Sequence, residues 1–269
     1  MQWIFPIIAI LTGLIIGSFL NVVIHRGPAL WRLVEDDRRQ GNLALPGSYC
    51  PACKAPIHPM NLIPVFSFLF LHGKCAACSA SISIRYPIVE ILGGGSALGA
   101  YILFGPSIAG FLAALFFWFM IALAFIDLET GFLPDVITLP LIALGLGANA
   151  ISTFVLFSAA LIGAGAGYFI FRIIGEIFSR WRGIEGLGQG DAKLLAAIGA
   201  WLGWQALAPA VFLAALLGLV VIFITRIAGK EITSQTPVPF GPALAASSAI
   251  ILAVSTLSSL PTPLEVIFP

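Results

Sequence analysis

Charged side chains are scarce in this chain, since Asp, Glu, Lys and Arg make up only 9% of its 269 residues and the formal net charge is +1. So small a charge gives no overall attraction to nucleic acid. Hydrophobic residues make up 59% of the chain and the mean hydropathy is +1.05, far from the composition of soluble domains. The sequence therefore predicts an integral membrane protein whose partner is the lipid bilayer and not nucleic acid.

Histidine and cysteine are also few, with 3 and 4 residues. The apolar segments hold no histidine placed for a serine triad, and every cysteine belongs to one paired cluster, which leaves no spare thiol nucleophile. The glycine-rich turn before Asp191 lacks the Gly-Lys-Ser/Thr of a phosphate loop, which disfavours nucleotide binding. The first apolar segment lacks a basic n-region, so we expect a retained anchor and not a secretory signal.

Apolar runs of about 17–25 residues, the length that crosses a bilayer, are the main pattern of the chain. Eight occur, near residues 3–24, 86–104, 107–126, 136–155, 157–178, 192–206, 208–228 and 240–260. The sixth is short and bounded by glycines, so a tilted or broken span and a single hairpin over 192–228 are alternatives. The fold class predicted is all-α, a polytopic membrane protein of about eight transmembrane helices with a small cytoplasmic zinc-ribbon-like loop domain.

Basic residues mark one side of this map. All thirteen lie between spans one and two, around the turn between spans five and six, or after span seven, and the opposite connections contain none. By the positive-inside rule the basic side is cytoplasmic, and an even span count places both termini on the periplasmic side. The set is Arg26, Arg32, Arg38, Arg39, Lys54, Lys74, Arg85, Arg172, Arg180, Arg182, Lys193, Arg226 and Lys230.

All four cysteines lie in the loop between spans one and two, as the pairs Cys50–Cys53 and Cys75–Cys78. Two C-x-x-C pairs at this separation are typical of a zinc ribbon, in which each pair gives two thiolates to one tetrahedral ion. Two disulfides are the alternative, but they need an oxidising compartment and the charge pattern places the loop in the cytoplasm. A thioredoxin-like redox pair would need a βαβ pattern, which is absent. Four thiolates leave no open position, so we expect the zinc to be structural.

Three domains follow from this pattern: a first transmembrane helix at 1–24, a zinc-binding cytoplasmic domain at 25–85 and a transmembrane core at 86–269. The middle domain has too little apolar area to fold alone, so the metal is expected to stabilise it. His58 and His72 lie between the cysteine pairs, but four cysteines already complete a ligand set.

Asp127 and Asp191 each stand where an apolar run meets a short polar one on the cytoplasmic side. Carboxylates near lipid are costly and mark candidate functional sites. Two aspartates can hydrolyse a peptide when one is ionised and takes a proton from water while the other is protonated and polarises the carbonyl. A helix cap is the alternative for Asp191, which closes Gly188-Gln189-Gly190-Asp191, whereas the glycines would also let an extended substrate approach.

Other acids have simpler interpretations. Asp135 is expected to cap the start of span four, and Glu129 to be solvated or interfacial. Glu176 lies four residues after Arg172, a spacing that permits an ion pair on a helix.

The chain resembles the type IV prepilin peptidases, membrane aspartyl proteases that carry a Gly-x-Gly-Asp motif. The likeness covers nearly the whole chain and rests, in family order, on residues 17–26, 61–67, 85–90, 127–135, 188–193 and 239–242. It implies that Asp127 and Asp191 are the catalytic pair and that Gly188, Gly190 and Lys193 support the active site.

The resemblance also implies a substrate and a cofactor. Its members cut the leader from type IV prepilins or type II secretion pseudopilins at the cytoplasmic face of the bacterial inner membrane, beside pilus or secretion assembly machinery. Many then methylate the new N-terminus with S-adenosylmethionine, and the tetracysteine loop belongs to the long family form associated with methylation. No glycine motif of soluble methyltransferases occurs here. Glu90, about one turn into span two, is a candidate for binding a substrate terminus or the methyl donor.

Two other functions stay open. One is a zinc-containing membrane transporter or scaffold that uses the aspartates as an ion path, and the other is a methyltransferase without protease activity. Both aspartates lie at one membrane face and no pair of matching interrupted spans suggests an inverted repeat, which disfavours the transporter.

Overall fold

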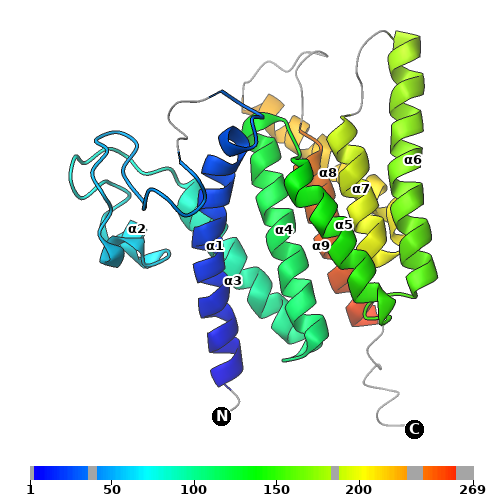
Figure 1. Ribbon diagram of the computed structural model, residues 1–269, viewed down its shortest axis with the longest axis horizontal. Helices are drawn as coiled ribbons and strands as arrows, with labels where there is room; N and C mark the ends of the chain where they lie inside the picture. Colours follow the sequence, from blue (N-terminus) through cyan, green and yellow to red (C-terminus); the bar gives the residue numbers. More distant parts are fainter. Residues whose placement is uncertain (1–2, 36–40, 183–187, 229–238, 259–269) are drawn as a thin grey trace. The chain divides into compact units, whose positions relative to one another are not determined.

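The computed structural model describes residues 3–35, 41–182, 188–228 and 239–258 (Figure 1). Within these ranges the chain is helical, with two isolated β-bridges and no strand. Eight long helices stand where the apolar runs predict them, which confirms the all-α class. They are α1 (Ile4–Leu30), α3 (Arg85–Phe104), α4 (Ile108–Thr130), α5 (Asp135–Ala150), α6 (Phe157–Arg182), α7 (Gln189–Leu202), α8 (Leu207–Ile227) and α9 (Gly241–Ser258).

Not all eight helices have the length of a full span. In the described ranges, five segments are long and apolar enough to cross a membrane: α1, α3, α4, α6, and α8 with the short helix η3 (Trp204–Ala206) that precedes it. α5 and α9 are apolar but shorter. α7 has 14 residues, or about 21 Å of helix against about 30 Å of hydrocarbon. The predicted count of eight spans is therefore approximate.

The sixth predicted span corresponds to α7, which is separated from α8 by a glycine turn. α7 ends at Leu202 because Gly203 adopts φ 78°, a conformation that favours glycine. η3 and α8 follow, so residues 192–228 form two helices joined by a short turn.

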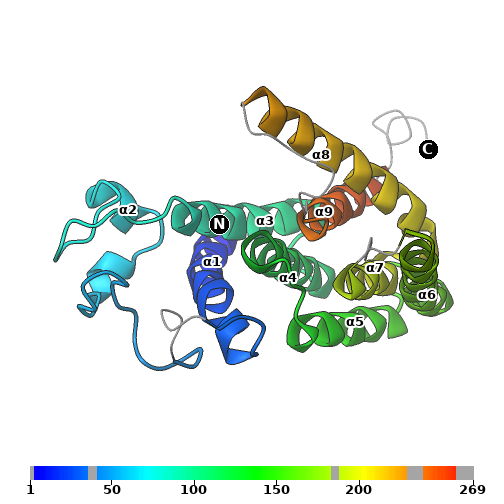
Figure 2. The same ribbon diagram turned by 90° about the horizontal axis from the view of Figure 1, so that it is seen from above.

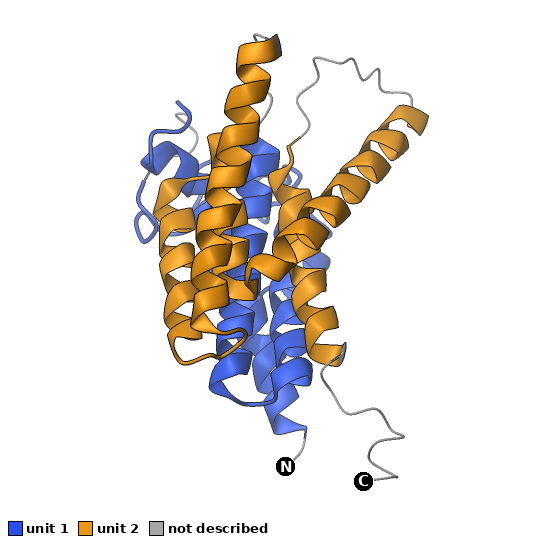
Figure 3. Cartoon of the chain, turned by 90° about the vertical axis from the view of Figure 1, so that its right-hand side faces the viewer, with its two compact units in different colours: residues 1–132 blue, residues 133–269 orange. Residues whose placement is uncertain are grey.

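Residues 1–132 form one compact unit, unit 1, which contains α1, α3 and α4 (Figures 2 and 3). α1 and α3 cross at glycines, and a Cβ added at Gly93 would lie 2.5 Å from the carbonyl oxygen of Gly13. Such close approach is typical of helix pairs in membranes, where small residues let the backbones pack directly. Trp118 of α4 adds a hydrogen bond of 3.1 Å from its indole N–H to the Gly93 carbonyl.

Unit 1 also contains the polar loop between α1 and α3, with the short helices η2 (Pro59–Leu62) and α2 (Phe66–Phe70). The apolar run ends at Ile24, but α1 continues to Leu30. Arg26, Gly27 and Pro28 in this extension are buried, because the loop folds back onto this end of the helix.

Residues 133–269 form unit 2, built around α7. All residues from 194 to 202 are buried, as expected for a helix that is apolar on every side. α6 crosses α7 at a second glycine contact, where a Cβ at Gly163 would lie 2.5 Å from the Gly199 carbonyl oxygen. Buried Asn149 of α5 donates to the carbonyls of Ala200 and Trp201 at 2.8 and 3.0 Å.

Arg38, Arg39, Lys230 and the tail after Leu260 lie outside the described residues, so the predicted charge topology stays a prediction at those positions.

Candidate functional site

The two cysteine pairs fold into the same local structure. Cys50 and Cys75 each donate their backbone N–H to the carbonyl five residues on, at 2.9 and 2.8 Å. The carbonyl of Cys50 accepts the backbone N–H of Lys54 at 2.8 Å, and the carbonyl of Cys75 accepts that of Ser79 at 2.9 Å. Lys54 and Ser79 also share positive φ values, 60° and 58°. Two tight turns of equal geometry thus present two pairs of thiols.

The four sulfur atoms of these turns converge. The Sγ atoms of Cys50, Cys53, Cys75 and Cys78 all lie within 4.8 Å of one another, and none of the four forms a disulfide. The Cys50 and Cys78 sulfurs are 3.9 Å apart. A tetrahedral zinc with bonds of about 2.3 Å would set sulfur separations of about 3.8 Å, so the cluster fits a metal ion of this kind. His58 is not in the cluster, because its Nδ1 accepts from the Met60 N–H at 3.3 Å.

The thiols of the cluster influence one another. The backbone amides of Cys78 and Ala77 lower the pKa of Cys75 to about 7. The Ala80 amide favours the Cys78 thiolate, but the neighbouring Cys53 thiol and burial raise the pKa of Cys78 to about 11. The opposite pKa shifts of Cys75 and Cys78 mean that these two thiols resist ionising together unless a cation compensates their charge.

Arg26 holds the cysteine loop against α1. Its guanidinium donates to the carbonyls of Asn42, Pro46 and Gly47 at 3.1, 2.7 and 3.2 Å and lies over the Tyr49 ring at 5.6 Å. The side chain is buried, so three carbonyls and an aromatic face replace its water.

Glu90 is a buried acid of α3, with 8% of its surface exposed. Its Oε2 accepts the backbone N–H of Val65 at 2.7 Å. Gly17 makes room for this residue, since a Cβ there would lie 2.7 Å from the Glu90 Cα. Glu90 therefore joins the cysteine loop to both helices of the glycine crossing.

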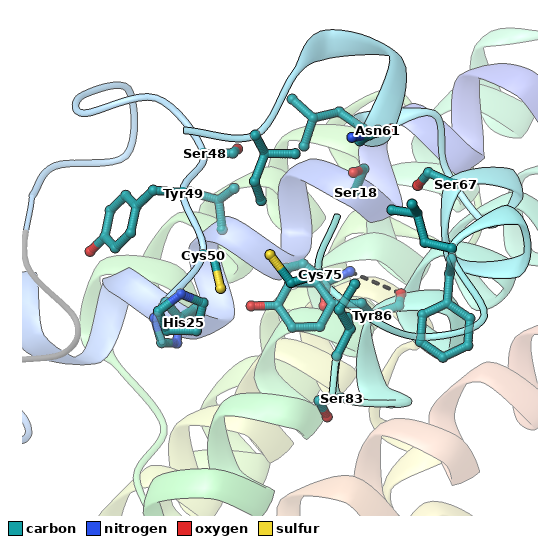
Figure 4. Close-up of a pocket in the computed structure, with 18 of the residues that line it drawn as sticks. Ser18, His25, Ser48, Tyr49, Cys50, Asn61, Ser67, Cys75, Ser83 and Tyr86 are labelled. Atoms are coloured by element: carbon teal, nitrogen blue, oxygen red, sulfur yellow. Dashed lines mark hydrogen bonds between the residues drawn. The ribbon is translucent and has the colours of Figure 1, made fainter. Parts of the chain in front are cut away.

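A cavity of about 1070 Å³ opens between the cysteine loop, α1 and α3, and Ser18, Cys50 and Tyr86 are among its lining residues (Figure 4). Glu90 and Asn21 also line it. Asn21 is 2% exposed, and its Nδ2 donates to the Tyr86 and Gly17 carbonyls at 3.0 and 3.3 Å. Its Oδ1 is buried and has no hydrogen-bond partner among the residues that the structure describes. Glu129, paired with Arg85, lies at the same cavity.

Asp127 lies in the last turn of α4 and is 6% exposed. The helix ends four residues later at Gly131, whose φ is 70° and whose N–H donates to the Asp127 carbonyl at 2.8 Å. An anion gains nothing from the dipole at a helix C-terminus, so a capping role does not account for this carboxylate.

Asp191 lies in the first turn of α7, behind the N-cap residue Gly188. This position favours a negative charge, so the capping interpretation agrees with its place. Close packing explains the glycine at position 190, because a Cβ there would lie 2.8 Å from the Leu133 Cβ. Lys193 bonds Asp135 at 2.5 Å and so ties the start of α7 to the start of α5.

The structure thus brings the four cysteines together and pairs Lys193 with Asp135. Glu176 pairs with Arg172 at 3.8 Å, as predicted. Asp135 stands in the first turn of α5, but Pro134 is the N-cap residue and the Asp135 carboxylate pairs with Lys193, so the predicted cap is not what the described residues show. Asp127 belongs to unit 1 and Asp191 to unit 2, so their pairing stays a prediction. Sequence reasoning gave no role to Asn21 or Arg26. A polar side chain inside the first apolar run was the available signal for Asn21.

The fold and the cysteine cluster define a polytopic helical membrane protein with a four-thiolate site in a polar loop. Residues 11–104 match the Bacterial Peptidase A24 N-terminal domain, and residues 114–223 match the Type IV leader peptidase family. The chain belongs to this family of leader peptidases.

Proteins named prepilin leader peptidase/N-methyltransferase are similar along nearly the whole chain. The protein of Burkholderia pseudomallei strain 1026b is 43% identical over 263 residues, covering 92% of this chain and 85% of its own. That of Aeromonas salmonicida strain A449 is 41% identical over 268 residues, covering 94% and 91%. That of Pectobacterium carotovorum subsp. carotovorum is 44% identical over 254 residues, covering 90% of each chain. No solved structure matches the chain.

Proposed function

We propose that this chain is an aspartic endopeptidase that removes the leader from type IV prepilins or related pseudopilins and N-methylates the new N-terminus with S-adenosylmethionine. The observation that carries the proposal is the 41–44% identity, over at least nine tenths of the chain, to proteins named for both activities. The matches cover at least nine tenths of this chain, so they extend over both units.

Asp127 and Asp191 are the proposed catalytic pair. One carboxylate, ionised, takes a proton from water, and the other, protonated, donates a hydrogen bond to the scissile carbonyl. Both stand at helix ends, one in the last turn of α4 and one in the first turn of α7. A peptide bond just outside a hydrophobic helix would meet such a pair at the membrane surface. The glycines Gly188 and Gly190 and the Lys193–Asp135 pair support the start of α7.

The cysteine cluster is proposed to hold one structural zinc ion. Its sulfur spacing agrees with a tetrahedral Zn²⁺ site, and four thiolates leave no position for a substrate. The bound ion would compensate the thiolate charge and fix both turns of the loop.

The proposed location is the bacterial inner membrane, with the cysteine loop and the aspartates at the cytoplasmic face and both termini periplasmic. The distribution of the basic residues supports this orientation. Prepilin or pseudopilin substrates are the expected partners, delivered beside pilus or secretion assembly machinery.

Cleavage of a purified prepilin by the purified full-length enzyme tests the proposal. The wild type should shorten the substrate, and Asp127→Asn or Asp191→Asn should each lower the rate by about 10²–10⁴-fold, the usual contribution of an acid–base group. Glu176→Gln is the control, because this acid forms exposed ion pairs within α6 and should leave cleavage unchanged. Near-normal cleavage by either aspartate variant would exclude the pair as catalytic.

A further inference from the structure

Two buried residues that line the cavity of unit 1 have hydrogen-bond acceptors whose capacity the described part of the chain does not use. The Asn21 Oδ1 has no partner, and because its Nδ2 donates to two carbonyls, the amide cannot be turned around to satisfy it. A buried acceptor without a donor costs about 1–3 kcal/mol and therefore calls for an explanation. A ligand that brings its own N–H groups is such an explanation.

The second acceptor is Glu90. A carboxylate offers about four acceptor positions, and the hydrogen bond from the Val65 amide uses one of them. In the described part of the chain no basic side chain neutralises it, since Arg26 donates to backbone carbonyls and Arg85 pairs with Glu129. A buried and unneutralised carboxylate favours a cation.

The cavity is large enough for a reactant of methylation. Its volume of about 1070 Å³ lies at the upper end of the range of about 300–1,000 Å³ that small-molecule sites occupy. A neutral amide oxygen and a carboxylate suit a primary ammonium, which offers three N–H donors and one positive charge. A sulfonium carries the charge but has no donor for Asn21.

We propose that this cavity is the methylation site of the enzyme and that Glu90 and Asn21 together bind the primary ammonium group of a methylation reactant. This inference rests on the proposed N-methyltransferase function. Two reactants carry such a group, S-adenosylmethionine on its amino acid part and the mature substrate at its new N-terminus.

The chemistry balances for the second reactant. Glu90 takes one N–H proton from the peptide ammonium, whose nitrogen then has a free lone pair. That lone pair forms a bond to the methyl carbon of the sulfonium, and the carbon–sulfur bond breaks with its electron pair left on sulfur. The positive charge passes from sulfur to nitrogen, and S-adenosylhomocysteine leaves. For the first reactant, Glu90 and Asn21 only bind and orient the donor.

The cavity lies on a different side of α4 from the proposed proteolytic carboxylate. Glu129 lines the cavity, and Asp127 stands two residues before it on the same helix. Two residues correspond to about 200° around an α-helix and about 3 Å along its axis, so the two carboxylates leave α4 on nearly opposite faces. Methylation should therefore be separable from cleavage by substitution.

The test uses the full-length enzyme, S-adenosylmethionine and a mature-length peptide that already has a free N-terminus. Glu90→Gln keeps an acceptor for the Val65 amide, and it should lower methylation by about tenfold or more while prepilin cleavage stays within about threefold. Asn21→Ala should act in the same direction. Glu176→Gln is the control, and metal content and thermal unfolding check the fold of each variant.

Titration with S-adenosylhomocysteine separates the two sources of the ammonium. Weaker binding by Glu90→Gln assigns the ammonium to the methyl donor. Unchanged binding with a raised KM for the mature peptide assigns it to the substrate. Normal methylation by both variants overturns the proposal, and so does equal loss of cleavage and methylation in Glu90→Gln.

A wild-type measurement covers the case in which the variants do not fold. Acetylation of the amino group of S-adenosylhomocysteine or of the mature peptide removes the positive charge. The compound whose ammonium is bound should lose at least about tenfold in affinity. If both acetylated compounds bind as well as their parents, the proposal is wrong. Because the peptide is already cleaved, failure of the aspartate pair would not affect these results.

Discussion

Unit 1 and unit 2 each contain a helix crossing made by glycines with a buried asparagine beside it, but the two asparagines differ. Asn149 in unit 2 uses its whole amide, because Nδ2 donates to two carbonyls of α7 and Oδ1 accepts from Phe154 and Val155 at 3.0 and 3.1 Å. Asn21 in unit 1 leaves its Oδ1 unused, next to a cavity. The same residue type is thus fully committed to the fold in one unit, and in the other it keeps an acceptor for something else.

The difference follows from what surrounds each crossing. In unit 2, α7 lies among α5, α6 and α9, and its residues from 194 to 202 are buried. In unit 1, the partner on one side of the crossing is the cysteine loop, whose only described helices, η2 and α2, have four and five residues. A unit whose interior depends on such a loop keeps polar groups and a cavity near its core. In unit 2 the buried Asn149 instead spends its amide on hydrogen bonds to the backbone around it.

Loss of the metal ligands should be the largest effect, and it should fall on unit 1 alone. Cys50→Ser or Cys75→Ser is expected to abolish binding of about one zinc ion per chain, a term worth roughly 10 kcal/mol or more in small zinc domains. Residues 41–82 should then become sensitive to protease while amide exchange in α7 stays slow. Metal analysis with limited proteolysis measures both.

His58→Ala is the matched control, since His58 lies in the same loop outside the sulfur cluster. Recovery of two disulfides and no metal from the wild type would refute the zinc site. Faster exchange in α7 of the cysteine variants would remove the contrast between the units.

Substitution at the glycine crossings should give the next largest effect and should be equal in the two units. Gly199→Val and Gly93→Val place a side chain against a backbone carbonyl, so we expect each to lower the free energy of unfolding by about 1–3 kcal/mol or more. Gly165→Val and Gly95→Val are the controls, because a Cβ at either site meets nothing within 4 Å. Unfolding of the purified variants in detergent measures the difference, and controls as unstable as the crossing variants would contradict the packing argument.

Alanine at the two asparagines tests the comparison directly. Asn149→Ala leaves two part-buried N–H groups and two buried carbonyls without this partner, so a loss of about 2–3 kcal/mol is expected. Asn21→Ala removes fewer bonds and also removes an unsatisfied oxygen, so its loss should be about 1 kcal/mol or less. Chemical unfolding gives both values. If Asn21→Ala is the more damaging substitution, the Asn21 side chain is structural in unit 1.

The sequence was sufficient for the features that depend on local pattern. Apolar runs located all eight helices, and the spacing of two cysteine pairs was enough to predict that four sulfurs converge. The apolar pattern predicted that the first helix ends at residue 24, whereas α1 ends at Leu30, because the polar His25 and Arg26 are typical of the start of a loop. The extension is stable only because carbonyls about twenty residues further along satisfy Arg26. Contacts of this range leave no periodic signal.

Some residues of the candidate site could likewise be predicted from local sequence pattern, and others could not. Asp127 and Asp191 were conspicuous because carboxylates at the ends of apolar runs are costly. The unused acceptor of Asn21 could not be foreseen, since an amide in an apolar run can equally be satisfied, as Asn149 is. The partner of Lys193 was also hidden, because Asp135 lies 58 residues earlier in the chain.

Breaking the Lys193–Asp135 pair of unit 2 should give the smallest loss of stability among these substitutions. Lys193 is 22% exposed in its side chain and Asp135 is 55% exposed, so water screens the pair. Lys193→Ala should therefore lower the free energy of unfolding by about 1 kcal/mol or less. Arg180→Ala, which breaks a more exposed pair with Glu176, is the control and should cost less still. If cleavage by Lys193→Ala falls far more than its stability does, Lys193 acts on the substrate or on Asp191, and the pair with Asp135 serves the active site as well as the fold of unit 2.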